Sequence, residues 1–386
     1  MSMILAAVTV AVLLIAGYAR EWARLRARPR LAPPDPLPAD APLVSLLIPA
    51  RNEERSIGRC VAGALAQRYP RFEVLVLDDA STDGTAAVLA GFAHDPRLRV
   101  LHGQALPRGW VGKSFACQQL SAQARGEWLL FLDADTAPQP DLAAALLTHA
   151  RRRDLDLVTI WPFLELGTFW ERVMLPPFLA FITTIYPLER FERPGTRPEE
   201  VLANGQCIFV RCAAYAAIGG HAAVRNQVLE DVHLAQAIRA AGFRIGGAEG
   251  PEYLHTRMYH NGREVAEGLA KHAAAGTRNS GARSWRAAVW HLMLAWGPLA
   301  LMGGGAALWA SGAGGGAASV MVAGIAAWVV EMWFFGALYR RRYHLSPLYA
   351  LLWPIGLLAY LLVAIRGMWR VRSGRGVSWK GRTYAG

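Results

Sequence analysis

The chain has 386 residues, of which 53% are hydrophobic and 18% are charged, and it carries a formal net charge of +12 at pH 7. This length holds a soluble domain of about 250 residues, and the mean hydropathy of +0.20 indicates that the remainder is membrane. The positive excess gathers beside apolar runs, at residues 20–30, 340–342 and 366–382, which favours contact with anionic lipid and argues against nucleic acid as a partner.

An apolar run at residues 4–18 has no Lys or Arg before it, whereas five arginines follow it between residues 20 and 30. Because positive charge stays on the cytosolic side of a membrane, this asymmetry predicts an anchor over residues 1–20 and a cytosolic domain after it. A signal peptide cleaved near residue 19 is the alternative, since small residues surround that point. Residues 21–42 are basic and then proline-rich, so we expect a stiff linker.

Segments with the patterns of strands and helices alternate after the linker. Apolar runs of strand length occur at residues 43–48, 72–77, 98–101, 128–132 and 244–248. Helical patterns lie between and after them, at residues 57–67, 85–92, 113–124, 141–152 and 230–241. Such alternation is typical of an α/β domain with a mostly parallel sheet, which we expect over residues 43–284.

The strand at residues 128–132 ends in two carboxylates separated by one residue, Asp133 and Asp135. Side chains alternate along a strand, so the pattern predicts that both point to the same side. Oxygen ligands of this kind suit Mg²⁺ or Mn²⁺, and open α/β sheets bind ligands at the carboxyl ends of their strands. We therefore predict a divalent cation here, with a nucleotide diphosphate beside it.

The first two strands deliver further carboxylates to the same edge, Glu53 after the first and Asp79 after the second. A carboxylate there can accept hydrogen bonds from a base or a ribose hydroxyl, and the N-terminus of the following helix favours phosphate. Residues 81–83 also fit a simple cap of the helix that begins at Thr85. Together with the two aspartates of the later strand, these loops predict a nucleotide site.

The acidic segments form four motifs: P-A-R-N-E-E at 49–54, D-D-A-S-T-D-G-T at 78–85, D-A-D at 133–135 and E-D at 230–231. Through these motifs the chain resembles family-two glycosyltransferases with the GT-A (Rossmann-like) fold. The resemblance implies an inverting sugar transfer in which Asp231, beside Glu230, is the catalytic base. It also implies that Asp133 and Asp135 bind Mg²⁺ or Mn²⁺. The residues that we assign to the nucleotide are Pro49, Arg51, Glu53, Asp79, Lys113, Asp133 and Arg257.

Two other enzyme classes share parts of these patterns. The D-x-D-x-T pattern from Asp133 also fits haloacid-dehalogenase-type phosphatases, whose first aspartate is a nucleophile. That motif normally ends the first strand of its domain, whereas here three strands precede it. Processive polysaccharide synthases carry Q-x-x-R-W, but here Arg239 is followed by Ala240. The missing tryptophan argues against a synthase that threads a polymer.

Segments at 106–113, 202–206, 257–259 and 379–384 resemble bacterial glucosyltransferases of the hydroxychlorobactene type, which glycosylate carotenoids. Hopanoid-associated glycosyltransferases share the Gly-Trp-x-Gly-Lys element at 109–113. The resemblance implies UDP-glucose or another UDP-sugar as donor and a lipid hydroxyl as acceptor, a carotenoid first, with hopanoid, glycerolipid or polyprenyl phosphate as alternatives. Residues that we expect to support the acceptor or the leaving group are Trp110, Asn204, Gln206, Arg239 and His255.

Two regions point to contact with lipid. Residues 166–192 are rich in aromatic side chains and interrupted by Pro176 and Pro177, so we expect an interfacial segment rather than a span. Residues 285–366 hold three apolar runs, and a break at 354–356 would make the last one re-entrant or interfacial, leaving a basic cytosolic tail at 367–386. The sequence thus predicts a multi-pass protein of the plasma or inner membrane with its catalytic domain in the cytosol.

Overall fold

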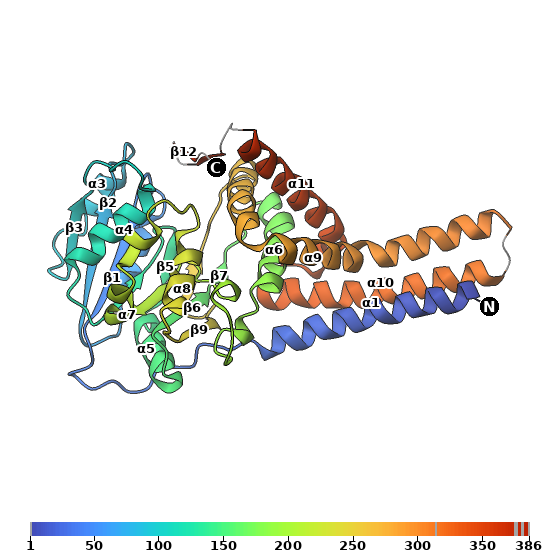
Figure 1. The fold of residues 1–386 in the computed structure, drawn as a ribbon, viewed down its shortest axis with the longest axis horizontal. Coiled ribbons are helices and arrows are strands. Elements are labelled where there is room, and N and C mark those ends of the chain that lie inside the picture. Colours follow the sequence, from blue (N-terminus) through green and yellow to red (C-terminus); the bar gives the residue numbers. More distant parts are fainter. Residues whose placement is uncertain (1, 313–314, 374–376, 380–381, 385–386) are drawn as a thin grey trace.

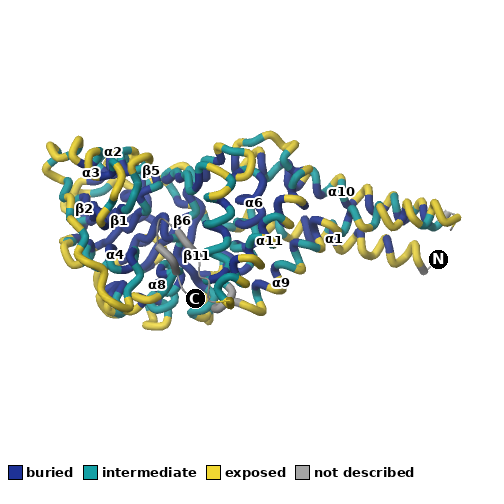
Figure 2. The backbone as a smooth tube through the Cα atoms, turned by 90° about the horizontal axis from the view of Figure 1, so that it is seen from above, coloured by how far each residue is buried: buried dark blue, intermediate teal, exposed yellow. Residues whose placement is uncertain are grey.

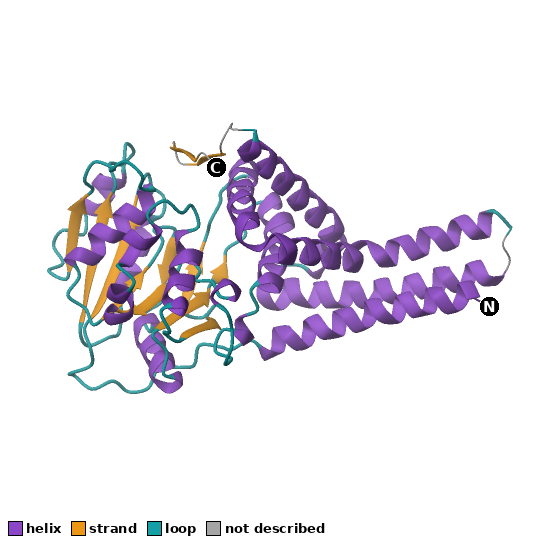
Figure 3. Cartoon of the chain, viewed as in Figure 1, coloured by secondary structure: helices purple, strands orange, loops and turns teal. Residues whose placement is uncertain are grey.

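The computed structural model describes residues 2–312, 315–373, 377–379 and 382–384 (Figure 1). An α/β domain and a bundle of long helices lie side by side, and Figure 3 shows that the strands gather almost entirely in the first of them. The predicted tail motif at 379–384 lies partly outside the described residues. The helix at residues 169–185 and the first turns of the helix that begins at residue 262 lie between the two parts (Figure 1).

The domain is built on one large twisted sheet in the order β3-β2-β1-β4-β8-β6-β9. The pairs β3-β2, β2-β1, β1-β4 and β6-β9 are parallel, whereas β8 pairs antiparallel with both neighbours. This confirms the predicted mostly parallel α/β fold. The strands are β1 Val44–Ala50, β2 Phe72–Asp78, β3 Leu98–His102, β4 Trp128–Phe131, β6 Leu157–Trp161, β8 Ile208–Arg211 and β9 Ile245–Glu249.

Helices cover both faces of the sheet, because its central strands are apolar on both sides. In β1, Leu46 and Ile48 pack into one core and Leu47 into the other, as strand alternation requires. The helices of the domain are α2 Ile57–Leu65, α3 Thr85–Ala90, α4 Gly112–Gln123, α5 Leu142–Arg153, α7 Cys212–Ala217 and α8 Glu230–Ala240. A small second sheet in the order β5-β10-β7 comprises β5 Thr136–Pro138, β7 Phe163–Leu164 and β10 Leu254–Thr256.

The bundle contains α1 Ser2–Ala27, α9 Gly262–Ala310, α10 Gly315–Arg342 and α11 Trp353–Arg372. Within the described residues, four helical segments are long and apolar enough to cross a membrane, at 3–27, 281–310, 316–342 and 347–372. Figure 2 shows that the far end of the bundle is largely exposed, and its exposed side chains include Leu13, Val322 and Trp309. A contiguous apolar surface of this kind suits contact with lipid.

Pro176 and Pro177 do not interrupt the helix, because α6 runs unbroken from Phe169 to Ile185. The interfacial placement of this segment stays a prediction. Proline removes the hydrogen bond to the carbonyl four residues earlier, here those of Arg172 and Val173. The hydroxyl of Tyr339 on α10 donates to the Arg172 carbonyl at 3.2 Å. Gly356 of α11 lies so close to the Val173 carbonyl that a Cβ would meet it at 2.1 Å. Neighbouring helices therefore accommodate the prolines.

Two features of the helical region bear on its expected boundaries. The expected change from domain to membrane region at 284 falls inside α9, which already begins at Gly262. The short helix η4 (Pro347–Leu352) precedes α11, and Figure 1 shows α11 inclined against the other three long helices rather than running along them. Re-entrant or interfacial placement of this last segment stays a prediction.

Candidate active site

A polar cavity of about 210 Å³ lies at the carboxyl ends of β1, β2 and β4, where the sequence places its acidic motifs. The adjoining wall comes from the loop before β8, from the start of α8 and from α9. We call this space the donor cavity, because the sequence leads us to expect a nucleotide-sugar donor there. The predicted residues that line it are Pro49, Arg51, Glu53, Asp79, Lys113, Asp133, Asp135, Asn204, Gln206, Glu230 and Asp231. Residues from several separate segments of the chain thus meet at one edge of the sheet.

The loops after β1 and β2 are tied to each other. The Arg51 guanidinium donates to the Asp79 carbonyl at 2.5 Å, and the Glu53 backbone N–H donates to Thr85 Oγ1 at 2.8 Å. The hydroxyl of Ser56 donates to Glu53 Oε2 at 2.9 Å. These bonds hold together the two loops that carry Glu53 and Asp79 to the cavity wall, where both carboxylates can accept from a nucleoside.

The D-A-D motif lies in a turn and not on a strand, because β4 already ends at Phe131. Thr136 closes this turn, donating to the Asp133 carbonyl from its backbone N–H at 3.1 Å and from its hydroxyl at 2.7 Å. We expected strand alternation to turn the two aspartates to the same side, and this explanation is wrong because they do not lie on a strand. Asp133 and Asp135 nevertheless both line the donor cavity.

Lys113, at the start of α4, bridges two acidic groups. Its ammonium lies 2.7 Å from Asp133 Oδ1 and 2.8 Å from Glu230 Oε1. Burial acts to lower the pKa of Lys113, but these two carboxylates and Asp231 hold it well above its ordinary value. The lysine is therefore a permanent cation on the floor of the cavity.

Asp231 is held by backbone donors at the N-terminus of α8. The Gly205 N–H donates to its Oδ2 at 2.9 Å, and the Val232 N–H donates to its Oδ1 at 2.8 Å. Burial raises the pKa of Asp231 to about 6, and the charge of Glu230 acts in the same direction. A carboxylate with this pKa is mostly ionised at neutral pH and still basic enough to accept a proton.

The donor set of the D-A-D motif fits a hard divalent cation. Asp133 and Asp135 offer carboxylate oxygens, and Asp133 already holds one cation, the Lys113 ammonium. Within the part of the chain that the structure describes, no group of three or more His, Cys, Asp or Glu side chains is placed to hold a metal ion. The remaining ligands would therefore come from the nucleotide and from water.

Four predicted residues lie away from the donor cavity. Arg257 pairs with Glu171 at 3.7 Å, and Arg239 donates to the Thr196 carbonyl at 3.1 Å. His255 faces Glu165 at 3.5 Å. The ring of Trp110 packs on Phe115 at a centroid distance of 5.3 Å. These contacts give all four side chains structural partners in this conformation.

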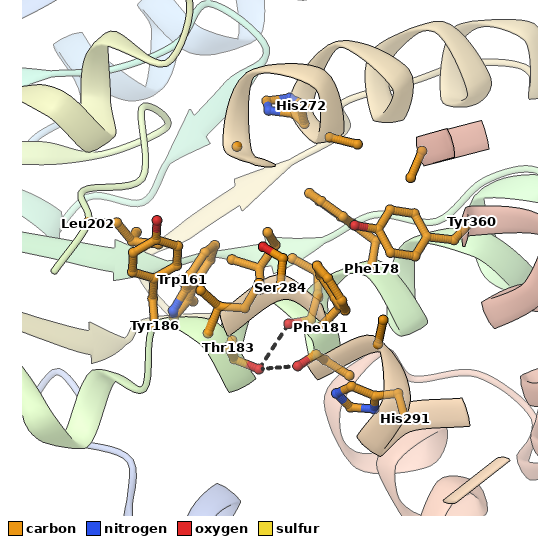
Figure 4. A pocket seen from close by; sticks show the side chains of 18 of the residues that line it. Trp161, Phe178, Phe181, Thr183, Tyr186, Leu202, His272, Ser284, His291 and Tyr360 are labelled. Atoms are coloured by element: carbon orange, nitrogen blue, oxygen red, sulfur yellow. Dashed lines mark hydrogen bonds between the residues drawn. The ribbon is translucent and has the colours of Figure 1, made fainter. Parts of the chain in front are cut away.

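A second, larger cavity of about 530 Å³ opens beside the first, between the domain and the bundle (Figure 4). Aromatic side chains line it, among them Trp161, Phe178, Phe181, Tyr186 and Tyr360, and Figure 4 shows them gathered around one space. Phe178 and Phe181 come from α6 and Tyr360 comes from α11, whereas Trp161 ends β6 and Tyr186 follows α6. We call this space the acceptor cavity, because the sequence leads us to expect a lipid acceptor.

The two cavities share part of their walls. The residues that line both are Asn204, Gln206, Leu229, Asp231, Met258 and His272. Burial and the nearby Lys271 and Lys113 charges lower the pKa of His272 to about 3, so its ring is neutral at the junction. The ionisable Asp231 carboxylate therefore lies where a polar site meets an apolar one.

Sequence reasoning missed three residues of the site. Lys271 and His272 lie on α9, in a part of the expected α/β domain for which we predicted no site residues. Gly205 was missed as well, although a Cβ there would come within 2.8 Å of Lys113 Nζ and 3.1 Å of Asp231 Oδ2. A glycine between two polar motif residues was the one available signal.

Comparisons with known proteins agree with this geometry. The family model described as Glycosyl transferase family 2 matches residues 45–219. A 4,4'-diaponeurosporenoate glycosyltransferase of Staphylococcus haemolyticus is 27% identical over 242 residues, which are 61% of this chain and 62% of that relative. The protein of the same name in Staphylococcus aureus is 27% identical over 236 residues, 60% of this chain and 61% of its own length. Less than two thirds of each relative is thus matched.

Among solved structures, a mannosyltransferase from Pyrobaculum calidifontis in complex with GDP-Man and Mn²⁺ superimposes with a TM-score of 0.54. It is 22% identical and covers 94% of this chain and 99% of its own, a likeness that shows the fold. The matched family, the curated relatives and the GT-A-like sheet agree with one another. Residues 45–219, which are less than half of the chain, form a glycosyl transferase family 2 domain.

Proposed function

We propose that the protein is a membrane-bound inverting glycosyltransferase. It moves a hexose from a nucleotide-diphosphate sugar to the hydroxyl of a lipid. We propose glucose as the hexose and a carotenoid as the lipid. The observation that carries this proposal is the position of Asp231, which lines both the polar donor cavity and the apolar acceptor cavity. A base at that junction can reach an acceptor hydroxyl while the donor lies on its other side.

The chemistry follows from the residues around the junction. Glu53 and Asp79 would hold the nucleoside, and Asp133 and Asp135 would hold Mg²⁺ or Mn²⁺ beside the diphosphate. Such an ion, when bound, neutralises the negative charge that collects on the leaving diphosphate. Asp231 accepts the proton of the acceptor hydroxyl as its oxygen attacks the anomeric carbon from the face opposite the diphosphate, which inverts that centre.

The apolar walls support a lipid acceptor. A soluble sugar or peptide would have little to gain from a cavity lined by aromatic and aliphatic side chains, whereas a polyisoprenoid buries its surface there. Trp285, which lines the cavity, and the segments long and apolar enough to cross a membrane support a position of this space near lipid. The name of the staphylococcal relatives supports a carotenoid among the possible lipids.

The donor is supported by the carboxylate loops and by the GDP-Man and Mn²⁺ complex of the Pyrobaculum enzyme. We propose UDP-glucose as the donor because the chain resembles bacterial glucosyltransferases of carotenoids. The relatives' name also raises a carboxylate acceptor as a second candidate. Six carboxylates line the donor cavity, Glu53, Asp79, Asp133, Asp135, Glu230 and Asp231, and would repel an anionic acceptor. A neutral hydroxyl therefore fits better.

Mass spectrometry of lipid extracts from cells with and without the protein tests this function. A lipid alcohol that gains the mass of one hexose only when the protein is present is the expected result. Loss of the corresponding free lipid should accompany it. A hexosylated carboxylate would select the second candidate, and an unchanged lipid profile together with a new soluble glycoside would contradict the proposal.

A further inference from the structure

The donor cavity contains a cation that none of its nucleotide-site motifs supplies. Lys271, on α9, lines the cavity together with Arg51 and Lys113. It lies close enough to Glu230, Lys113, Asp133 and Asp231 for their charges to act on it. A helix that continues into the bundle thus sends a lysine into the polar site of the α/β domain.

The packing of α9 determines where Lys271 stands. The side chain of Asn261 caps the helix by accepting from the Glu264 N–H at 2.9 Å. Gly268 lies against Tyr259, where a Cβ would come within 2.3 Å of the tyrosine hydroxyl. On the other side, a Cβ on Gly367 of α11 would meet the Ala270 carbonyl at 2.5 Å. Close contacts on two sides therefore fix the backbone that carries Lys271.

Two further cations, Arg51 and Lys113, line the same cavity. Arg51 donates to the carbonyls of Asp79 and Ala80, and Lys113 bridges Asp133 and Glu230. A diphosphate that enters among the carboxylates of this cavity brings further negative charge and needs cations near it. Burial lowers the pKa of Lys271, and a bound phosphate would favour its charged form.

We propose that Lys271 binds the diphosphate of the sugar donor and stabilises the charge that forms on it during transfer. This rests on the proposed function. The bond from the anomeric carbon to the diphosphate oxygen breaks, and its electron pair stays on that oxygen. The acceptor oxygen forms the new bond to carbon, and its proton goes to Asp231. Lys271 stays protonated throughout and donates to the diphosphate.

The location of Lys271 adds a consequence. The next residue, His272, lines both cavities, and Ser284 and Ala288 farther along α9 line the acceptor cavity. Binding of the diphosphate to Lys271 would therefore hold the helix that forms one acceptor wall. Donor and acceptor affinities should then be coupled, each improving in the presence of the other.

The test compares Lys271→Met, which removes the charge and keeps most of the length, with Lys271→Arg, both in the full-length protein in detergent. Affinities for UDP, UMP, GDP and GMP with Mn²⁺ are measured by calorimetry. For whichever nucleotide the wild type prefers, we expect Lys271→Met to weaken diphosphate binding at least about tenfold and monophosphate binding by less than about twofold. Lys271→Arg should retain most of the affinity.

Arg263→Met is the matched control, because Arg263 is on the same helix, 87% exposed and paired with Glu267. It should leave both affinities unchanged. Unchanged diphosphate binding by Lys271→Met, or equal losses for diphosphate and monophosphate, would overturn the role of Lys271. A wild type that binds none of the four nucleotides would instead contradict the proposed function, so the two failures are distinguishable.

Discussion

The Gly205 backbone N–H donates to Asp231 Oδ2 at 2.9 Å, and this bond joins the loop before β8 to the first turn of α8. It leaves the carboxylate oriented toward the junction of the two cavities. A side chain at residue 205 would crowd both Asp231 and Lys113, so the close approach explains a glycine there.

The pH dependence of transfer should report the ionisation of Asp231. Burial and Glu230 raise its pKa to about 6, and a base must be deprotonated to act. The value of kcat/KM should therefore be level above about pH 7 and fall about tenfold per pH unit below pH 6. Initial rates between pH 5 and 8 check this. A rate that stays level down to pH 5 would argue against a carboxylate base with this pKa.

Replacement of Asp135 tests the cation site. Asp135→Ala removes one of the two carboxylates that the turn presents, so Mn²⁺ or Mg²⁺ should no longer raise the affinity for a nucleoside diphosphate. Calorimetric titration with and without the metal provides the measurement. Glu252→Gln, at an exposed residue outside the donor cavity, is the control. Metal-stimulated binding that survives in Asp135→Ala would show that Asp135 is not a ligand.

Filling the acceptor cavity should weaken binding of the lipid acceptor and leave binding of the donor unchanged. Ala288 lines this cavity on α9, and Ala288→Trp would occupy space that a polyisoprenoid needs. We expect the KM for the lipid to rise about tenfold or more, with the KM for the donor unchanged. The control is Ala282→Trp, six residues earlier on the same helix, where the residue is exposed and does not line the cavity. Equal effects of the two substitutions would count against the acceptor site.

Glu249 should be important for stability. Its carboxylate at the end of β9 pairs with Arg28 of α1 at 2.8 Å and with Arg342 of α10 at 2.9 Å, and all three side chains are largely buried. Glu249→Gln would leave two buried guanidinium groups without their anion, at a cost of about 3 kcal/mol or more. A lower thermal unfolding midpoint is expected, whereas Glu252→Gln should change it little. Equal midpoints for the two variants would refute this role.

Most of the fold could be predicted from the sequence where the signals are local. Strand β2 and helix α2 begin where their apolar patterns predict, at Phe72 and Ile57. Strands β6 and β8 were missed. The antiparallel insertion of β8 between β4 and β6 depends on pairing between segments about 50 residues or more apart, which a local pattern does not encode.

The site, like the fold, could be predicted only where it depends on local sequence signals. Residues that follow the sheet strands, such as Glu53 and Asp79, line one cavity, because parallel strands deliver their ends to one edge. Lys271 was not predictable, since its place depends on how α9 packs on Tyr259 and α11. Arg257 was expected at the diphosphate, but the buried Glu171 carboxylate holds it at the start of α6.

The most direct test is the transfer of labelled sugar from UDP-glucose to a hydroxylated carotenoid by purified wild-type protein and by Asp231→Asn. The wild type should move label into the lipid fraction with inversion at the anomeric carbon. Asp231→Asn should bind the nucleotide normally, and its transfer rate should be lower by a factor of about 10² to 10⁴. Label that never enters lipid in any wild-type reaction, or undiminished turnover by Asp231→Asn, would contradict a base that joins a donor site to a lipid site.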